Sequence, residues 1–165
     1  MKKMFAALLA VLLMAPAMAF AQGSVLMVEL PQDAQMVEDV VFDDGDFIQT
    51  YQLPGGAQVQ LLRYAAFDMT LGDLFASEWV GATDVRELDV AEVGGYPAQG
   101  LRFAYQEEGQ PALDVALVVI NAGETLVFSA VFPAGTADAQ LQTMIDSMSV
   151  MTEGEAPAQN HVVVG

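Results

Sequence analysis

The residues best suited to chemistry are acidic and cluster early in the chain. Glu38 and Asp39 stand together, and Asp43, Asp44 and Asp46 surround a glycine. Carboxylate oxygens around a glycine turn can bind calcium, so Asp39, Asp43, Asp44 and Asp46 are candidate metal ligands. The spacing differs from an EF-hand loop, in which the acids alternate and a glutamate ends the loop. Asp-Gly is also a common hairpin turn, so a turn without metal is the alternative interpretation.

Few other residues of the chain are of types that commonly act in catalysis. The chain has no cysteine and one histidine, His161, near its C-terminus. Thiolate catalysis and cysteine-based metal sites are therefore excluded, and the serines lack the G-x-S-x-G context of a nucleophile elbow. Paired carboxylates alone do not define a glycosidase, which needs two of them held in a sugar-binding cleft. We expect no enzymatic activity and no cofactor, apart from the calcium considered above.

Three arginines carry a second binding signal. Arg102 lies on a strand face opposite two apolar neighbours, so we expect it to point to solvent or to a partner. Arg63 and Arg86 fall among strand-forming apolar residues. In so acidic a chain each is expected to pair across a strand with an aspartate or glutamate. A site for a ligand carboxylate is the alternative. Arg102 and Tyr96, in the turn before the same strand, are the predicted partner-binding residues.

The first 21 residues have the pattern of an export signal. Two lysines precede an apolar run over residues 4–14, and Ala19-Phe20-Ala21 matches the A-x-A cleavage pattern. The run is shorter than the roughly 20 apolar residues of a membrane helix, although an uncleaved anchor is the alternative. No cysteine is present for lipid attachment. We predict cleavage after Ala21, a periplasmic or secreted protein, and no membrane insertion afterwards.

The charge balance limits the classes of partner. Both lysines fall in the signal segment, so three arginines face 22 acidic residues in the rest of the chain. Such a surface repels nucleic acid phosphates and anionic lipid headgroups. It favours basic partners or divalent cations, and solubility alone is the simplest alternative.

Residues 22–151 have the pattern of a single α+β domain. Strand patterns separated by glycine, proline and aspartate turns fall at 25–30, 36–42, 47–53, 58–67, 83–93, 99–105, 112–120 and 125–132. Helices are predicted after a Thr70–Asp73 capping box and after an N-cap at Thr136. Strands 112–120 and 125–132 are apolar on both faces, which is typical of central strands covered on both sides. We expect an antiparallel sheet with two helices, and a flexible tail over 152–165.

The second predicted helix leaves room for a small-ligand hypothesis. Leu141, Met144 and Met148 follow helical spacing and form an apolar stripe. An apolar pocket between this stripe and Phe128 and Phe132 could hold a ligand, because methionine-rich walls adapt to varied shapes. Simple core packing is the alternative interpretation.

One stretch resembles a known family. Gly94-Gly95-Tyr96-Pro97-Ala98, followed by Gly100-Leu101-Arg102-Phe103, is similar to a turn-and-strand pattern of the PsbP-like superfamily, which includes DcrB-type bacterial envelope proteins. The resemblance extends over 94–149, to the closing Ile145-Asp146-Ser147-Met148. It implies a twisted antiparallel sheet flanked by two helices and a binding or accessory role. The shortage of basic residues departs from members that dock on acidic partners, and no family site maps onto these residues.

These observations together predict an exported, non-enzymatic interaction module that docks on an envelope protein. The alternative is a binder of a small ligand or of calcium. The sequence names neither the partner nor the ligand.

Overall fold

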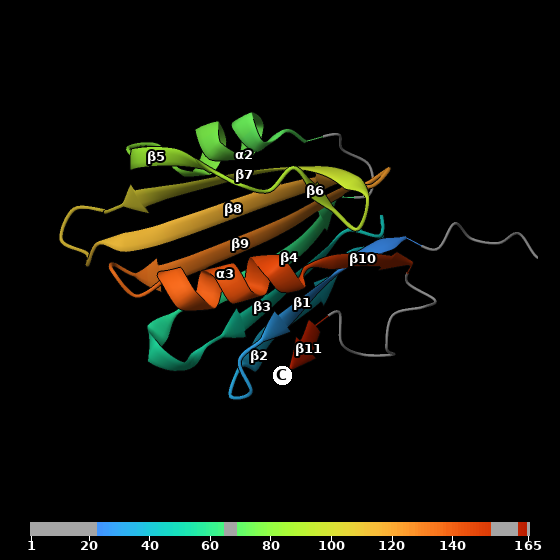
Figure 1. The fold of residues 1–165 in the computed structure, drawn as a ribbon, viewed down its shortest axis with the longest axis horizontal. Coiled ribbons are helices and arrows are strands. Elements are labelled where there is room, and N and C mark those ends of the chain that lie inside the picture. The colour runs from blue at the N-terminus through green and yellow to red at the C-terminus, as the bar shows by residue number, and fades with distance from the viewer. Residues whose placement is uncertain (1–22, 65–68, 153–161, 165) are drawn as a thin grey trace, which may run out of the picture.

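The computed structural model describes residues 23–64, 69–152 and 162–164, which fold into strands and short helices (Figure 1). In chain order the strands are β1 (Ser24–Leu30), β2 (Gln35–Val41), β3 (Phe47–Gln52), β4 (Gln58–Tyr64), β5 (Thr83–Leu88), β6 (Glu92–Val93), β7 (Tyr96–Tyr105), β8 (Leu113–Asn121), β9 (Thr125–Pro133), β10 (Ser149–Thr152) and β11 (Val162–Val164). The helical segments are the 3-10 turn η1 (Pro54–Gly56), α2 (Leu71–Glu78) and α3 (Asp138–Ser147).

An antiparallel sheet of eight strands forms the body of the described protein. Its strands follow the order β2-β3-β4-β9-β8-β7-β5, and β6 pairs with β7. Every pairing within it is antiparallel. The predicted α+β class, with an antiparallel sheet and two helices, is therefore confirmed.

The two strands with apolar residues on both faces lie at the centre of this sheet. β8 and β9 form a hairpin that closes at the pair Asn121 and Thr125. Val118 and Phe128 are fully buried on one face, and Val115 is fully buried on the other. Burial on both faces explains why these strands lack the apolar-polar alternation of a half-exposed strand.

One face of the large sheet is covered by α3 and a second sheet, of order β10-β1-β11. β1 pairs antiparallel with β10 and parallel with β11. Leu26 of β1 and Leu141 and Met144 of α3 join Phe128 in one buried cluster. α3 and the N-terminal strand β1 therefore cover this face together.

The opposite face is covered over β7 and β8 by α2 (Figure 1). Leu71 and Leu74 of α2 are buried there with Phe103. Aromatic rings complete this layer, with centroid separations of 5.1 Å for Phe75 and Phe103 and 5.4 Å for Trp79 and Phe103. Phe75 of α2 and Trp79 at its C-terminal end therefore pack against the core on this face.

The two helix starts differ in how well the sequence predicted them. Thr70 caps α2, and the reciprocal hydrogen bonds with Asp73 complete the predicted capping box. α3 instead has Ala137 as its N-cap residue, with no side-chain cap. The Thr136 hydroxyl donates to the Pro133 carbonyl oxygen at 2.7 Å, so the predicted cap at Thr136 is wrong.

The ends of the chain bear on three predictions. Residues 1–22, with the signal and its cleavage site, lie outside the described residues, as does His161. Val162–Val164, placed in a tail by the sequence, form β11 beside Val28–Leu30. None of the helices in the described ranges combines the length and the apolar character required to cross a membrane.

Candidate functional site

Among the described residues, the large sheet ends in two edges, β2 and β5. An edge strand leaves one row of backbone N–H and C=O groups without a strand partner. Such a row can pair with an extended segment of another chain. The side chains of each edge strand determine how open it is to that pairing.

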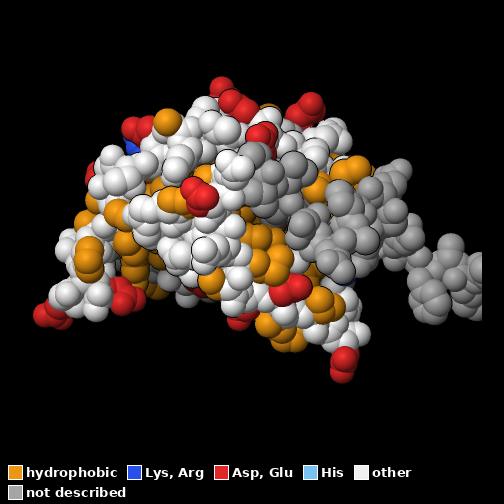
Figure 2. Space-filling model, turned by 90° about the horizontal axis from the view of Figure 1, so that it is seen from below, with side chains coloured by type: hydrophobic (Ala, Val, Ile, Leu, Met, Phe, Trp, Pro, Cys, Tyr) orange, Lys and Arg blue, Asp and Glu red, His pale blue; other side chains and the backbone are white. Residues whose placement is uncertain are grey.

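β2 and the residue after it carry five of the eight large apolar side chains that are exposed in the described residues. These five are called the β2 edge surface: Met36, Val37, Val40, Val41 and Phe42. The exposed fraction reaches 70% for Val41 and 59% for Val37. Figure 2 looks at the molecule from below in the view of Figure 1, and shows apolar patches set among acidic side chains. A concentration of exposed apolar side chains on one edge is typical of a binding surface.

The local backbone explains this exposure. Val41 lies opposite the buried Phe47, and no strand of the described residues lies on its outer side. The register shifts between Met36 and Glu38, so Val37 occupies a β-bulge. Neither proline nor lysine, which commonly protect edge strands, interrupts residues 35–42. The β2 edge is therefore open to pairing.

Two carboxylates of β2 lie between the apolar residues of the β2 edge surface and accept hydrogen bonds from side chains on β3. Glu38 Oε2 accepts a hydrogen bond from Thr50 Oγ1 at 2.8 Å, and Asp39 Oδ1 accepts one from Gln49 Nε2 at 3.1 Å. Burial raises the pKa of Tyr51 to about 12, and the negative charge of Asp39 contributes to the shift. The edge thus combines apolar contact with fixed negative charge.

The turn after β2 is closed by its own backbone and by an arginine. Gly45 adopts a φ of 92°, which favours glycine, and Asp44 Oδ1 accepts from the Asp46 backbone N–H at 3.1 Å. Arg63 donates to the Gly45 carbonyl oxygen through Nε at 2.9 Å and through Nη2 at 2.7 Å. The predicted hairpin turn is confirmed, and a guanidinium already binds its central carbonyl.

This geometry gives the calcium prediction no support. Within the described ranges, no three histidine or carboxylate side chains are grouped as ligands of one metal ion. Asp44 is engaged with the turn backbone, and Asp39 is engaged with Gln49 on the strand. Asp43 and Asp46 accompany Asp44 in the turn, which the turn interpretation explains without a metal. A calcium site at these four aspartates stays a prediction.

Arg102 does not point freely to solvent or to a partner, which corrects the expectation from strand alternation. Its side chain is only 14% exposed. Nη2 lies 3.4 Å from Asp114 Oδ2 on β8, and Nη1 lies 2.5 Å from Asp138 Oδ1 at the start of α3. Alternation placed Arg102 on the correct face but did not reveal that α3 packs beside it.

Tyr96 is not brought together with Arg102. It begins β7 and is 39% exposed. The two residues are six positions apart on one strand, which corresponds to roughly 20 Å. They therefore do not form one compact partner-binding site.

β5, the other edge, is less open to pairing than β2. Its pairing with β7 shifts register between Thr83 and Arg86. Within this bulge Asp84 has a φ of 53°, a left-handed conformation that is uncommon for residues other than glycine. β2 also contains a bulge and two carboxylates, so the edges differ mainly in apolar exposure. β5 exposes one large apolar side chain, Val85, whereas the β2 edge surface has five. This contrast makes β2 the candidate docking edge.

The methionine-lined pocket is not found between helix and sheet. Leu141, Met144, Phe128 and Phe132 are at most 3% exposed and pack in the core, as the alternative interpretation expected. A surface pocket of about 290 Å³ instead lies between the end of β1 and α3, and Met144 contributes to its wall.

Sequence reasoning missed the β2 edge surface because local patterns do not show which strand ends a sheet. Residues 36–42 were identified as a strand, but the sequence pattern did not show that this strand would lie at the edge of the sheet. The absence of proline and lysine in this strand was the signal that could have identified an open edge.

Comparison with known proteins gives no match to a protein-family model and no match to a curated protein. The resemblance to the PsbP-like superfamily therefore stays a prediction.

Proposed function

We propose that the protein is an exported, non-enzymatic docking module that binds an extended segment of a partner protein along β2. The proposal rests on the β2 edge surface, which joins an unpaired strand edge to five exposed apolar side chains. Addition of a strand would satisfy the outer backbone groups and cover these side chains at the same time.

The charge around β2 supports a basic partner. Glu38, Asp39, Asp43 and Asp44 are exposed beside the apolar side chains. The whole chain has a formal net charge of −17. A segment that alternates apolar residues with lysine or arginine would match both features, and charge complementarity would speed its encounter with the edge.

A second copy of this chain is a poorer occupant of the edge. Pairing β2 with β2 would bring the acidic side chains of both copies together, and like charges across a strand pair are destabilising. Net charge of the same sign on both copies adds repulsion at longer range. The proposal therefore commits to a different, basic protein.

Site-specific photo-cross-linking in producing cells tests the proposal. A photoreactive residue replaces Val41 on the β2 edge, and the matched control carries it at Val85 on the β5 edge, where the exposed fraction is 46%. We expect the Val41 position to capture one protein reproducibly, through an extended segment that contains lysine or arginine. The Val85 position should not capture that protein.

The captured segment is then synthesised and titrated against the purified protein. Loss of apolar contact in Val41→Ser, which leaves the charge unchanged, should weaken binding by about tenfold or more, and added salt should weaken it further. Equal capture at both positions, no capture at Val41, or an acidic captured segment would overturn the proposal.

A further inference from the structure

Two of the three arginines lie directly opposite each other on the face of the large sheet that α3 covers. Arg86 of β5 pairs in register with Arg102 of β7. Arg102 in turn lies opposite Ala116 of β8, on the face that contributes to the cluster around Phe128. Like charges directly opposite on neighbouring strands repel each other, so this pair needs anions nearby.

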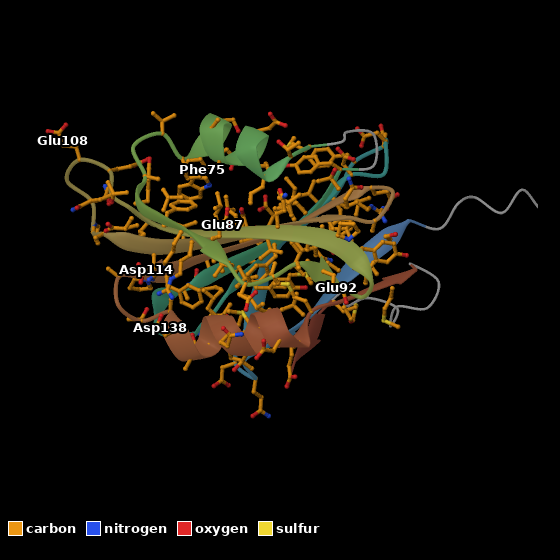
Figure 3. The ribbon with its side chains drawn as sticks, turned by 45° about the horizontal axis from the view of Figure 1, so that its top comes forward. Phe75, Glu87, Glu92, Glu108, Asp114 and Asp138 are labelled. Carbon is orange, nitrogen blue, oxygen red and sulfur yellow. The ribbon has the colours of Figure 1, made fainter. Side chains whose placement is uncertain are left out.

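Among the described carboxylates, ion pairs form with Arg102 and none forms with Arg86. Asp114 and Asp138 accept from the terminal nitrogens of Arg102, and Figure 3 shows both aspartates at the same end of the fold. Arg86 is exposed and forms neither a hydrogen bond nor an ion pair with any described residue. The Arg86 guanidinium therefore retains its full capacity to bind an anion.

Arg102 also keeps a donor that no described residue uses. Its Nε is buried and has no hydrogen-bond acceptor. A buried donor without an acceptor is unfavourable, and a small turn of the guanidinium toward an incoming oxygen would relieve it. Both arginines thus have N–H groups to offer one ligand.

A surface cleft of about 450 Å³ lies where these two side chains meet. Its walls come from β5, β7 and β8, and the lining residues are Asp84, Val85, Arg86, Arg102, Phe103, Ala104 and Asp114. The β-bulge and the left-handed Asp84 form one wall. Bulges and uncommon backbone conformations are over-represented at functional sites.

We propose that this cleft binds the carboxylate group of a small organic acid between Arg86 and Arg102. The planar guanidinium presents paired N–H donors that match a carboxylate. Asp84 and Asp114 in the same lining favour a ligand that also carries an ammonium group over a simple acid. The site lies on the β5 side of the sheet and is independent of docking at β2.

The test uses the purified protein with ¹⁵N-labelled arginine, titrated with propionate and with alanine at constant ionic strength. The Nε–H groups of only three arginines give signals, so each can be followed by NMR. We expect the Arg86 and Arg102 signals to shift at millimolar ligand. Arg63 serves as an internal reference because its Nε already donates to Gly45.

Two variants complete the test. Arg86→Gln should weaken binding by about tenfold or more, since it removes a charge-assisted pair. Glu87→Gln changes the charge on the same strand but lies opposite Leu101, on the other face, and should leave affinity unchanged. Tighter binding of alanine than of propionate would assign a role to the aspartates. Equal shifts at Arg63, equal shifts with chloride, or no shift with either ligand would overturn the proposal.

Discussion

Arg63 shows how one buried cation can organise several segments. Its guanidinium donates to the Gly45 carbonyl in the turn after β2 and to the Ser24 carbonyl at the start of β1. It also lies over the Phe47 ring, 5.0 Å from the centroid. The sequence predicted a cross-strand carboxylate for this arginine and did not anticipate these bonds to backbone carbonyls. Residue types do not indicate which backbone carbonyl will accept a hydrogen bond, because every residue has one.

Tyr51 gives a prediction about stability in alkaline solution. Burial, with Asp39 contributing, raises its pKa from 10.0 to about 12. Between these two values the unfolded chain loses the phenolic proton while the folded protein keeps it. The contribution of Tyr51 to the free energy of unfolding should therefore be fully present below pH 10. As pH rises toward 12, the loss of this contribution should lower the free energy of unfolding by about 1 to 2 kcal/mol.

Urea denaturation between neutral and alkaline pH measures this effect. Tyr51→Phe should flatten the decline, because no phenol remains at that position to ionise. Tyr96→Phe is the matched control, since the Tyr96 side chain is exposed, and its pH profile should follow that of the parent protein. Identical slopes for the two variants would contradict the assignment to Tyr51.

At the scale of single elements, α2 and α3 start in physically different ways. Thr70 Oγ1 accepts from the Asp73 backbone N–H at 3.1 Å. The Thr70 hydroxyl and backbone N–H donate to Asp73 Oδ2 at 2.6 and 3.1 Å, and these two bonds lower the pKa of the Asp73 carboxyl. Thr70→Ala should lower the free energy of unfolding by about 1 kcal/mol. Thr136→Ala should cost no more than about 0.5 kcal/mol, because Thr136 does not cap α3.

Thermal or urea unfolding of the two variants distinguishes these starts. Because the pKa of Asp73 is lowered in the folded protein, its ionised carboxyl contributes to the free energy of unfolding above the ordinary carboxyl pKa. This contribution is lost as pH falls through the folded value, so the difference between Thr70→Ala and the parent protein should narrow in acid. The part of the difference due to the bond from the Asp73 backbone N–H to Thr70 Oγ1 should remain. Equal losses for the Thr70 and Thr136 variants at neutral pH would show that the cap assignment is wrong.

The sequence predicted the positions of the strands better than it predicted which strands pair with each other. Alternation and turn residues located β1 to β4 and β7 to β9, and the two doubly apolar runs were identified as central. The predicted strand 83–93 is instead the two strands β5 and β6, and β10 and β11 were not predicted. The pairing of β1 with β10 and β11 was not foreseen, because it joins residues more than a hundred positions apart. The Arg86–Arg102 pairing was missed for the same reason, since local periodicity carries no information on register between strands. Local sequence patterns therefore identified single candidate residues but did not show which of them lie close together in the fold.

At the scale of the whole molecule, the net negative charge affects whether two copies of the chain can associate through the β2 edge. The chain carries 22 acidic residues, and its formal net charge at pH 7 is −17. Repulsion between copies therefore guards an open, apolar β2 edge that lacks the protective lysines and prolines of other edge strands. Under the proposed function, this repulsion would keep β2 available to a basic partner and would oppose pairing between two copies of the chain.

This argument predicts self-association in mild acid. As pH falls to about 4, where aspartate and glutamate protonate, the repulsion weakens while the β2 edge surface remains. Light scattering and sedimentation should show a monomer at neutral pH and growing assemblies near pH 4. Val41→Lys, which puts a charge on the β2 edge, should suppress the assemblies, whereas Val85→Lys on the β5 edge should not. Equal suppression by both variants would mean that net charge alone governs association and that β2 has no special role.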